Sequence, residues 1–524
     1  MLSRFTKINE KTSMWSIISI LVWLIIFSAS TLLLRGRRHN RKLPPGPPGW
    51  PLFGNMFDLG TMPHRTLTEL RNKYGDVLWL KFGARNTMAI LSTKAATEFF
   101  KNHDLSFADR TITETMRAHD YCKGSLALAP YGSFWRVLRR IVTVEMLVNK
   151  RINETASVRR KCVDNMLSWV EKEAAARQGD AVAHGVQVGR FVFLTSFNLL
   201  GNLMLSRDLL DPEAEDTGEF FGAVLKLMQW SGHGNMADFF PWLRRLDPQG
   251  LRRKMDRDLG KALEIASRFV RERVDQDNKF MSDDKEKEKK TKDFLDVLLE
   301  FQGNGKDEPS KISEKNINIF ILEIFLAGSE TTSSTIEWAM TELLCNPESL
   351  NKAKAELTEV VGPNKRVEET DIENLPYLRA VVKETMRLHP PIPLLVPRRA
   401  IEDTNFQGYH IPKNTQVLIN VWAIGRDPDV WDEPWSFKPE RFLGSKIDYK
   451  GHNYEFIPFG AGRRMCAGVP LAQRMLHLIL GSLLHHFDWQ LGANVCKEKM
   501  DMKDRLGITM RKAEPLLAVP KRST

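Results

Sequence analysis

The sequence has few cysteines, and their positions do not suggest pairing. Among its 524 residues it carries five, at 122, 162, 345, 466 and 496, with no CxxC pair among them. An odd, scattered set argues against a disulfide framework and offers neither zinc-ligand spacing nor a redox dithiol. We therefore expect reducing surroundings for the body of the protein.

The sequence also lacks internal repeats and any nucleic-acid-binding motif. Hydrophobic residues make up 42% and charged residues 27%, which is typical of a globular chain with a real core. The formal net charge is +11. Because no nucleic-acid motif accompanies that charge, we expect membrane lipid or an acidic protein as the partner, and no nucleic acid.

One long stretch contains no charged residue. Residues 14–34, MWSIISILVWLIIFSASTLLL, are long enough to cross the hydrocarbon core of a bilayer as one helix. A cleaved signal peptide is the alternative, but its apolar region is usually shorter, about 7–15 residues. Basic residues follow at once, so the positive-inside rule predicts a single-pass anchor with the catalytic body in the cytosol. This divides the chain into an N-terminal extension (1–13), a transmembrane anchor (14–34), a basic and proline-rich linker (35–55) and a body (56–524).

The body is mostly helical in pattern. Amphipathic stretches cover residues 64–74, 133–147, 157–175, 255–275 and 313–345, and strand-like runs cover 77–82 and 87–91. The fold class predicted from these patterns is mainly α with small β-sheets.

One cysteine lies in an unusual setting, FGAGRRMCAGVP at residues 459–470. Glycines around Cys466 let the backbone approach a large planar ligand, and Pro470 suits the first turn of a following helix. Amide donors and a helix amino terminus favour a thiolate at Cys466. Arg464 is a delocalised cation suited to a carboxylate. A buried structural thiol is the usual fate of a lone cysteine, but these neighbours favour a thiolate that ligates a haem iron.

Read with its spacing, F-x-x-G-x-R-x-C-x-G, this stretch resembles the haem-binding signature of the cytochromes P450. The resemblance covers the chain from the apolar span to the C-terminus. It implies the cytochrome P450 fold behind a single transmembrane helix, and heme b, iron protoporphyrin IX, with Cys466 as the axial metal ligand. Phe459 and Arg464 are then cofactor-binding residues.

Further motifs occur in the same family order. In KETMR and FKPERF the resemblance assigns a structural triad of Glu384, Arg387 and Arg441. Glu384 and Arg387 are three residues apart and share a helix face, and a buried carboxylate needs more than one partner to offset desolvation. An exposed helix ion pair is the alternative for such a pair.

Two more sites resemble clamps for the haem propionates. Trp135 and Arg139 match a W-x-x-x-R motif, and Arg398 occupies the position of another propionate donor. A core tryptophan and a surface arginine are the ordinary readings of these residue types.

The reactive side is AGSETT, residues 327–332, where Gly328 interrupts a helical pattern. The resemblance implies a local opening of the helix there, with Thr331 hydrogen-bonding the activated dioxygen and Glu330 relaying protons, a general-acid task. A threonine bonded back to its own helix and a solvated glutamate are the alternatives.

The resemblance identifies a plant microsomal cytochrome P450 monooxygenase of the branch that includes geraniol 8-hydroxylases and iridoid oxidases. It implies residence in the endoplasmic reticulum membrane and electrons from NADPH-cytochrome P450 reductase. The substrate pocket is expected at Ala327, Leu394, Leu395 and Ile508, whose apolar walls favour a small apolar monoterpenoid or iridoid. A flavonoid or alkaloid hydroxylase, and a non-catalytic haem-binding membrane protein, are the alternatives.

Overall fold

A computed structural model describes residues 42–176, 185–211, 218–282, 292–306, 308–492 and 500–523, together with Ser19 and Val22. The predicted extension, 1–13, and all of the predicted anchor except those two residues lie outside the described part of the chain.

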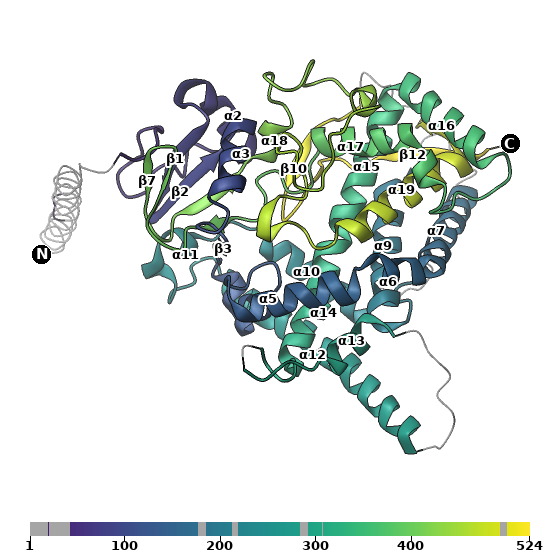
Figure 1. The fold of residues 1–524 in the computed structure, drawn as a ribbon, viewed down its shortest axis with the longest axis horizontal. Coiled ribbons are helices and arrows are strands. Elements are labelled where there is room, and N and C mark those ends of the chain that lie inside the picture. The colour runs from purple at the N-terminus through teal and green to yellow at the C-terminus, as the bar shows by residue number, and fades with distance from the viewer. Residues whose placement is uncertain are drawn as a thin grey trace, which may run out of the picture.

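Helices dominate the described residues, as the sequence predicts (Figure 1). They are α2 (Pro63–Tyr74), α3 (Thr93–Asn102), α4 (Tyr121–Gly124), α5 (Ser133–Arg140), α6 (Asn149–Glu154), α7 (Ala156–Ala176), α9 (Val188–Leu205), α10 (Glu219–Ser231), α11 (Met236–Phe239), α12 (Leu251–Ser282), α13 (Phe294–Glu300), α14 (Glu314–Gly328), α15 (Glu330–Cys345), α16 (Pro347–Val361), α17 (Pro376–Leu388), α18 (Val421–Ile424) and α19 (Val469–His486).

The strands are short and form small sheets. They are β1 (Val77–Phe82), β2 (Arg85–Ile90), β3 (Asp109–Arg110), β4 (Val186–Gln187), β5 (Arg398–Arg399), β6 (Thr404–Phe406), β7 (Tyr409–Ile411), β8 (Gln416–Ile419), β9 (Phe487–Leu491), β10 (Asp504–Leu506), β11 (Met510–Lys512) and β12 (Leu517–Arg522). The largest described sheet has the order β1-β2-β8-β5-β3, with β2 and β8 parallel and the other pairs antiparallel.

The described part of the linker, from residue 42 onward, lies against this sheet. Trp79 N–H donates to Pro45 O at 2.8 Å, and a Cβ on Gly46 would lie 1.9 Å from Trp79 O. Glycine is therefore required where the proline-rich segment passes β1. The sheet and α2 and α3 form the side of the molecule where the described chain enters (Figure 1).

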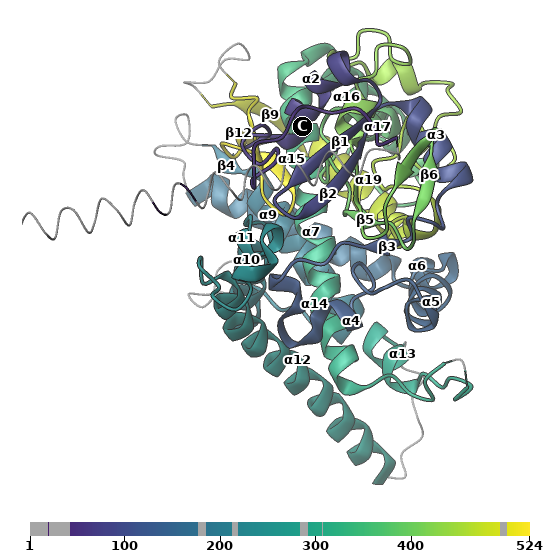
Figure 2. The same ribbon diagram turned by 90° about the vertical axis from the view of Figure 1, so that its left-hand side faces the viewer.

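The predicted helix over 313–345 is divided in two. α14 ends at Gly328, and α15 begins at Glu330 after Ser329. Both helices lie in the middle of the helical region and pack against α9 (Figures 1 and 2). Their interior position brings the predicted reactive segment to the centre of the body.

One described helix, α9, is long and apolar enough to span a bilayer. However, 78% of it is buried inside the protein, where it packs against α7, α14 and α15. It is a core helix, apolar on all sides because protein surrounds it.

Candidate active site around Cys466

The Cys466 segment turns directly into α19. Cys466 N–H donates to Phe459 O at 3.0 Å, and Gly468 N–H donates to the Cys466 Sγ at 3.3 Å. Pro470 stands in the first turn of α19, as the sequence predicts. Burial raises the pKa of the Cys466 thiol, while the amides of Gly468 and Val469 and the charge of Arg139 oppose that rise.

Accessible surface remains at Cys466, Ala327 and Thr331. Cys466 keeps exposed surface although protein surrounds it. Ala327 is exposed in the middle of the central helix pair, and between Glu330 and Leu344 every residue of α15 is buried except Thr331. A planar group bound beside Cys466 and α14 would cover surface at these positions.

Gly462 has a different role from the one predicted. The sequence suggests that glycines here admit a ligand, but a Cβ on Gly462 would lie 2.2 Å from Asp104 Oδ1, and its φ is +68°. Asp104 accepts from Arg398 Nη1 at 2.6 Å and from Arg463 N–H at 3.0 Å. Gly462 therefore makes room for a carboxylate that holds the Cys466 segment to Arg398.

The predicted clamp residues gather around this segment, bonded mostly to the backbone. Trp135 Nε1 donates to Leu126 O at 2.9 Å, and Arg139 Nη1 donates to Met465 O at 2.6 Å. Arg464 donates to Ala108 O at 2.8 Å and to Ala129 O at 2.6 Å, and its guanidinium lies 4.3 Å from the centre of the Trp135 ring.

The buried arginines near Cys466 carry more positive charge than is balanced by the carboxylates that pair with them. Burial lowers the pKa of Arg464 to about 10, and repulsion from Arg398 and Arg139 adds to this. Burial and the charges of Arg398 and Arg464 also hold the pKa of Arg110 well below its usual value. The one carboxylate of Asp104 forms ion pairs with both Arg398 and Arg463. Such a surplus of buried cations fits an anionic group, and with the Cys466 sulfur it fits a haem and its two carboxylates.

Glu330 pairs with a residue that the sequence reasoning missed. Its Oε1 lies 2.8 Å from Arg511 Nη1 on β11, while Oε2 is buried with no hydrogen-bond partner within the described residues. The Glu330 side chain is only 4% exposed, whereas Arg511 is 41% exposed. Arg511 thus connects a buried carboxylate to the solvent side.

The hydroxyls around the helix break bond back to helix carbonyls. Thr331 Oγ1 donates to Ala327 O and Thr332 Oγ1 donates to Gly328 O, both at 2.8 Å. Ser329 Oγ donates to Phe325 O at 2.5 Å. Because the Thr331 hydroxyl already donates its one hydrogen bond to Ala327 O, its lone pairs can only accept a further hydrogen bond.

The predicted pocket residues come from separate elements. Leu394 packs against the apolar cluster of β1 and α2, and Leu395 packs against a cluster containing Ile457 and Ala461. Leu395 has a positive φ of +50°, and its Cδ1 would lie 3.5 Å from a Cβ on Gly460. Ile508, at the turn between β10 and β11, is half-buried against the main core. Leu395 is thus the member placed beside the Cys466 segment.

The predicted triad residues are in direct contact. Arg387 Nε and Nη2 each donate to Glu384 at 2.7 Å, and Arg441 Nε donates to Glu384 Oε1 at 3.1 Å. The Glu384 and Arg387 side chains are fully buried. The pair is therefore an interior one, and the alternative of an exposed ion pair does not apply.

A second acidic residue was also missed by the sequence reasoning. Glu323 on α14 is 8% exposed and accepts three hydrogen bonds from residues 125–127. Its signal in the sequence is a single carboxylate inside the apolar run IFILEIFLAG. A charged residue in such a run requires buried partners.

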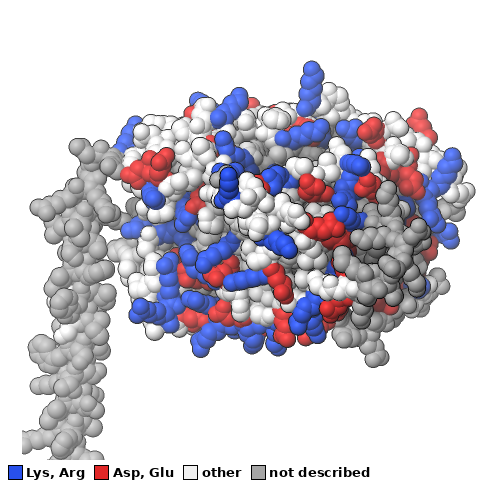
Figure 3. Space-filling model, turned by 60° about the horizontal axis from the view of Figure 1, so that its bottom comes forward, with Lys and Arg blue, Asp and Glu red and all other residues white. Residues whose placement is uncertain are grey.

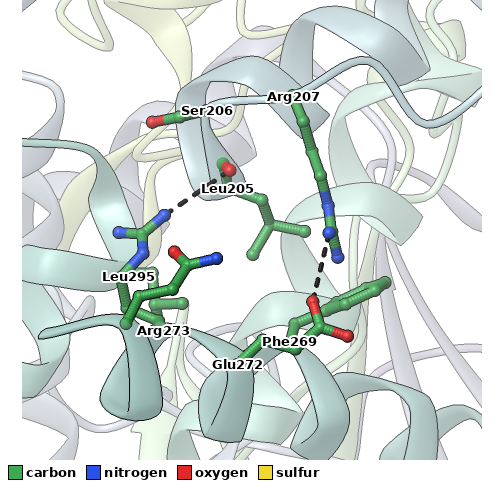
Figure 4. A pocket seen from close by; sticks show the side chains of 8 residues that line it. Leu205, Ser206, Arg207, Phe269, Glu272, Arg273 and Leu295 are labelled. Carbon is green, nitrogen blue, oxygen red and sulfur yellow. Dashed lines mark hydrogen bonds and ion pairs between the residues drawn. The ribbon is translucent and has the colours of Figure 1, made fainter. Parts of the chain in front are cut away.

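A separate cavity of about 210 Å³ lies between α9, α12 and α13 (Figure 4). Arg207 pairs with Glu272 there, and Arg273 pairs with Asp293 and Asp296. None of the residues lining this cavity belongs to the predicted site, so the cavity is separate from the Cys466 segment.

Comparison with known proteins identifies the family. The family model for Cytochrome P450 matches residues 44–519. Cytochrome P450 76A2 of Solanum melongena is 57% identical over 93% of this chain and 94% of its own length. An iridoid oxidase of Catharanthus roseus is 51% identical over 96% of this chain and 95% of its own. A geraniol 8-hydroxylase of Swertia mussotii is 43% identical over 92% of this chain and 94% of its own.

The fold comparison agrees. A zebra fish cytochrome P450 solved with progesterone superposes with a TM-score of 0.71 at 26% identity, covering 88% of this chain and 99% of that one. The resemblance to the branch of iridoid oxidases and geraniol 8-hydroxylases is thereby confirmed.

Proposed function

This chain belongs to the cytochrome P450 family and is a monooxygenase of that family, and we propose that it inserts one oxygen atom from O2 into a monoterpenoid or iridoid. The observation that carries the proposal is the accessible surface that Cys466, Ala327 and Thr331 keep, with the half-buried side chain of Leu395 beside the Cys466 segment. Named relatives include an iridoid oxidase and a geraniol 8-hydroxylase.

The proposed contacts to the haem come from residues that lie around the Cys466 segment. Cys466 would bind the haem iron through its sulfur, and Arg139, Arg398 and Arg464 would supply positive charge for the two carboxylates, with Trp135 supporting Arg464. Phe459 lies at the start of the segment, and its carbonyl fixes the Cys466 amide at 3.0 Å. A haem held there supplies the activation of O2 and the transfer of one oxygen atom.

Glu330 and Thr331 are proposed to handle the protons of the reaction. Arg511 fixes Glu330 Oε1, so the unpartnered Oε2 is the oxygen that can carry a proton. The Thr331 hydroxyl donates to Ala327 O and can accept from a proton-bearing group beside it. In this proposal a proton passes from Glu330, which pairs with Arg511, to Thr331.

The side chains expected to line the pocket support the substrate class. Ala327, Leu394, Leu395 and Ile508 are apolar and would bind a ligand by shape and by area removed from water, at roughly 25 cal/mol per Å². A polyhydroxylated ring would leave buried hydroxyls unpaired, at a cost of roughly 1–3 kcal/mol each. A hydrocarbon-rich terpenoid with one alcohol leaves fewer groups to satisfy.

We further propose that the electrons come from NADPH through NADPH-cytochrome P450 reductase, and that residues 14–34 anchor the chain in the endoplasmic reticulum membrane. The uncharged run 14–34 and the basic residues after it support this orientation.

The test is product analysis in microsomes that carry the full chain and a plant reductase. Geraniol, an iridoid, the flavanone naringenin and a set of alkaloids are supplied with NADPH, and a parallel titration follows each ligand through the haem spectrum. We expect an oxygenated terpenoid and tighter binding of geraniol or the iridoid than of naringenin. Product from naringenin or an alkaloid alone would assign a flavonoid or alkaloid hydroxylase instead.

A further inference from the structure

Residues 125–129, here called the clamp loop, connect α14 to the arginines near Cys466. On one side of the loop lies Glu323 of α14. Its Oε1 accepts from Ser125 Oγ at 2.5 Å and from Ala127 N–H at 2.8 Å, and its Oε2 accepts from Leu126 N–H at 2.6 Å. The buried Glu323 carboxylate thus accepts hydrogen bonds from the Ser125 hydroxyl and from the amides of residues 126 and 127.

On the other side of the loop, the carbonyls accept from cofactor-binding side chains. Leu126 O accepts from Trp135 Nε1 at 2.9 Å and from Arg464 Nη1 at 3.4 Å. Ala129 O accepts from Arg464 Nη2 at 2.6 Å. The peptide group that joins residues 126 and 127 therefore donates to Glu323 through its N–H and accepts from Trp135 and Arg464 through its oxygen.

The 126–127 peptide group thus lies between a negatively charged and a positively charged side chain. A carboxylate on the amide side and a guanidinium on the carbonyl side polarise the peptide in the same direction, so each hydrogen bond strengthens the other. The charge of Glu323 also offsets part of the surplus positive charge of Arg464, whose attraction opposes the rise that burial causes in the pKa of Glu323.

Glu323 also has a defined place relative to the reactive segment. It lies four residues before Ala327 on α14, so the two share one face of that helix. The loop that Glu323 holds is therefore fixed to the helix that carries Ala327, next to the α14–α15 break.

We propose that Glu323 is the positioning residue that fixes the clamp loop, and through it the orientation of Arg464 and Trp135 toward the carboxylates of the bound haem. The inference rests on the proposed haem-binding function of these residues. Glu323 itself touches neither substrate nor cofactor in this scheme.

The test compares Glu323→Gln with Glu314→Gln in the resting holoenzyme. Glutamine offers one acceptor oxygen and places an NH2 against the Leu126 N–H, so the loop loses a charged acceptor. Glu314 is the matched control, because it lies on the same helix and accepts from Ser267 at an exposed position. Ser125→Ala is a milder variant that removes one donor and keeps the carboxylate.

Two measurements can be made without catalytic turnover of the enzyme. One is the hydrogen exchange of the loop amides, and the other is the rate at which haem passes to an excess of apomyoglobin. For Glu323→Gln we expect exchange at residues 126–127 to accelerate about tenfold or more, while the β1 and β2 amides stay unchanged, and haem loss to accelerate with it. Ser125→Ala should shift both readouts in the same direction by less, and Glu314→Gln should shift neither.

Unchanged loop exchange in Glu323→Gln, or acceleration spread evenly over β1 and β2, would overturn the proposal, since the latter describes a general loss of stability. Haem loss equal to that of the wild type would also overturn it. A wild-type enzyme that oxidises no terpenoid leaves both readouts intact, so that result refutes only the substrate assignment.

Discussion

At the scale of the residue, the Cys466 sulfur is held by short-range contacts that a serine can largely reproduce. Gly468 N–H donates to it, and the Cys466 amide is bonded to Phe459 O. Cys466→Ser should therefore fold but lack a thiolate. We expect it to lose the displaced Soret band that thiolate-ligated haem gives when the reduced protein binds carbon monoxide. The carbon monoxide difference spectrum measures this, with Cys345→Ser as the control, and an unchanged spectrum in Cys466→Ser would mean that another residue is the axial ligand.

The hydroxyl of Thr331 gives a second prediction at the scale of the residue, which concerns the coupling of NADPH consumption to product formation. Its hydroxyl donates to Ala327 O, and alanine would remove the group that we propose directs proton delivery. Thr331→Ala should still consume NADPH, but more of the electrons from NADPH should reduce O2 to hydrogen peroxide in place of forming product, and Thr331→Ser should retain coupling. Product and peroxide formed per NADPH are the measurements. Equal coupling in Thr331→Ala and wild type would remove this role from Thr331.

At the scale of the element, the sequence patterns located helices and strands but not their interruptions. The run predicted at 77–82 is β1 without correction, and 64–74 is α2 to within one residue. The helix predicted over 313–345 breaks at Ser329, where hydroxyls bond to carbonyls of the preceding turn. α9 was not predicted, because a helix buried on all sides has no polar face and so no 3.6-residue period.

The candidate site was predictable only where its residues stand in local motifs. Glu384 and Arg387 are three apart in sequence, so their contact follows from helix geometry. Arg398 and Asp104 are 294 positions apart and meet only through packing. The pairing of Glu330 with Arg511 depends likewise on how β11 docks on α15. Contacts of this kind are set by the tertiary fold, and spacing in one sequence does not encode them.

The segment before Cys466 gives a prediction at the element scale. Gly462 and Gly444 have nearly equal φ values of +68° and +67°, but a Cβ on Gly444 meets nothing within 4 Å, whereas one on Gly462 meets Asp104 at 2.2 Å. Gly444→Ala should cost only the left-handed strain, about 1 kcal/mol. Gly462→Ala should cost more and lower haem content, because it displaces Asp104 from Arg398. Urea unfolding and the haem-to-protein ratio test this, and equal losses in both variants would contradict it.

At the scale of the whole molecule, the net charge of +11 is a surface property. Arg159, Arg387, Arg398 and Arg464 are buried, but among the described residues more carboxylates than cationic side chains are buried, so burial does not reduce the net positive charge at the surface. Acidic and basic side chains are interspersed on the face drawn in Figure 3. An acidic partner therefore meets local groups of cations on that face, rather than one continuous basic surface.

Stability toward acid is also a property of the whole fold, and buried neutral histidines contribute to it. His477 in α19 is 1% exposed, and its Nδ1 lies 2.6 Å from Gln473 O. Burial lowers the pKa of His477 from 6.5 to about 4, with repulsion from Arg379, Lys383 and Arg474 adding to this and the bond to Gln473 opposing it. Between pH 6.5 and 4 the unfolded chain therefore binds a proton that the folded protein does not.

Stability must then fall as the pH falls through that window, by about 3 kcal/mol for this one group when the window is crossed. His477→Met fills a similar volume and cannot take up the proton. We expect the free energy of unfolding of this variant to decline less between pH 6.5 and 4 than that of the wild type. Urea unfolding at a series of pH values measures the difference, with the exposed His452→Gln as the control. If His477→Met and the wild type lose stability with the same dependence on pH, His477 is not among the groups that destabilise the fold in acid.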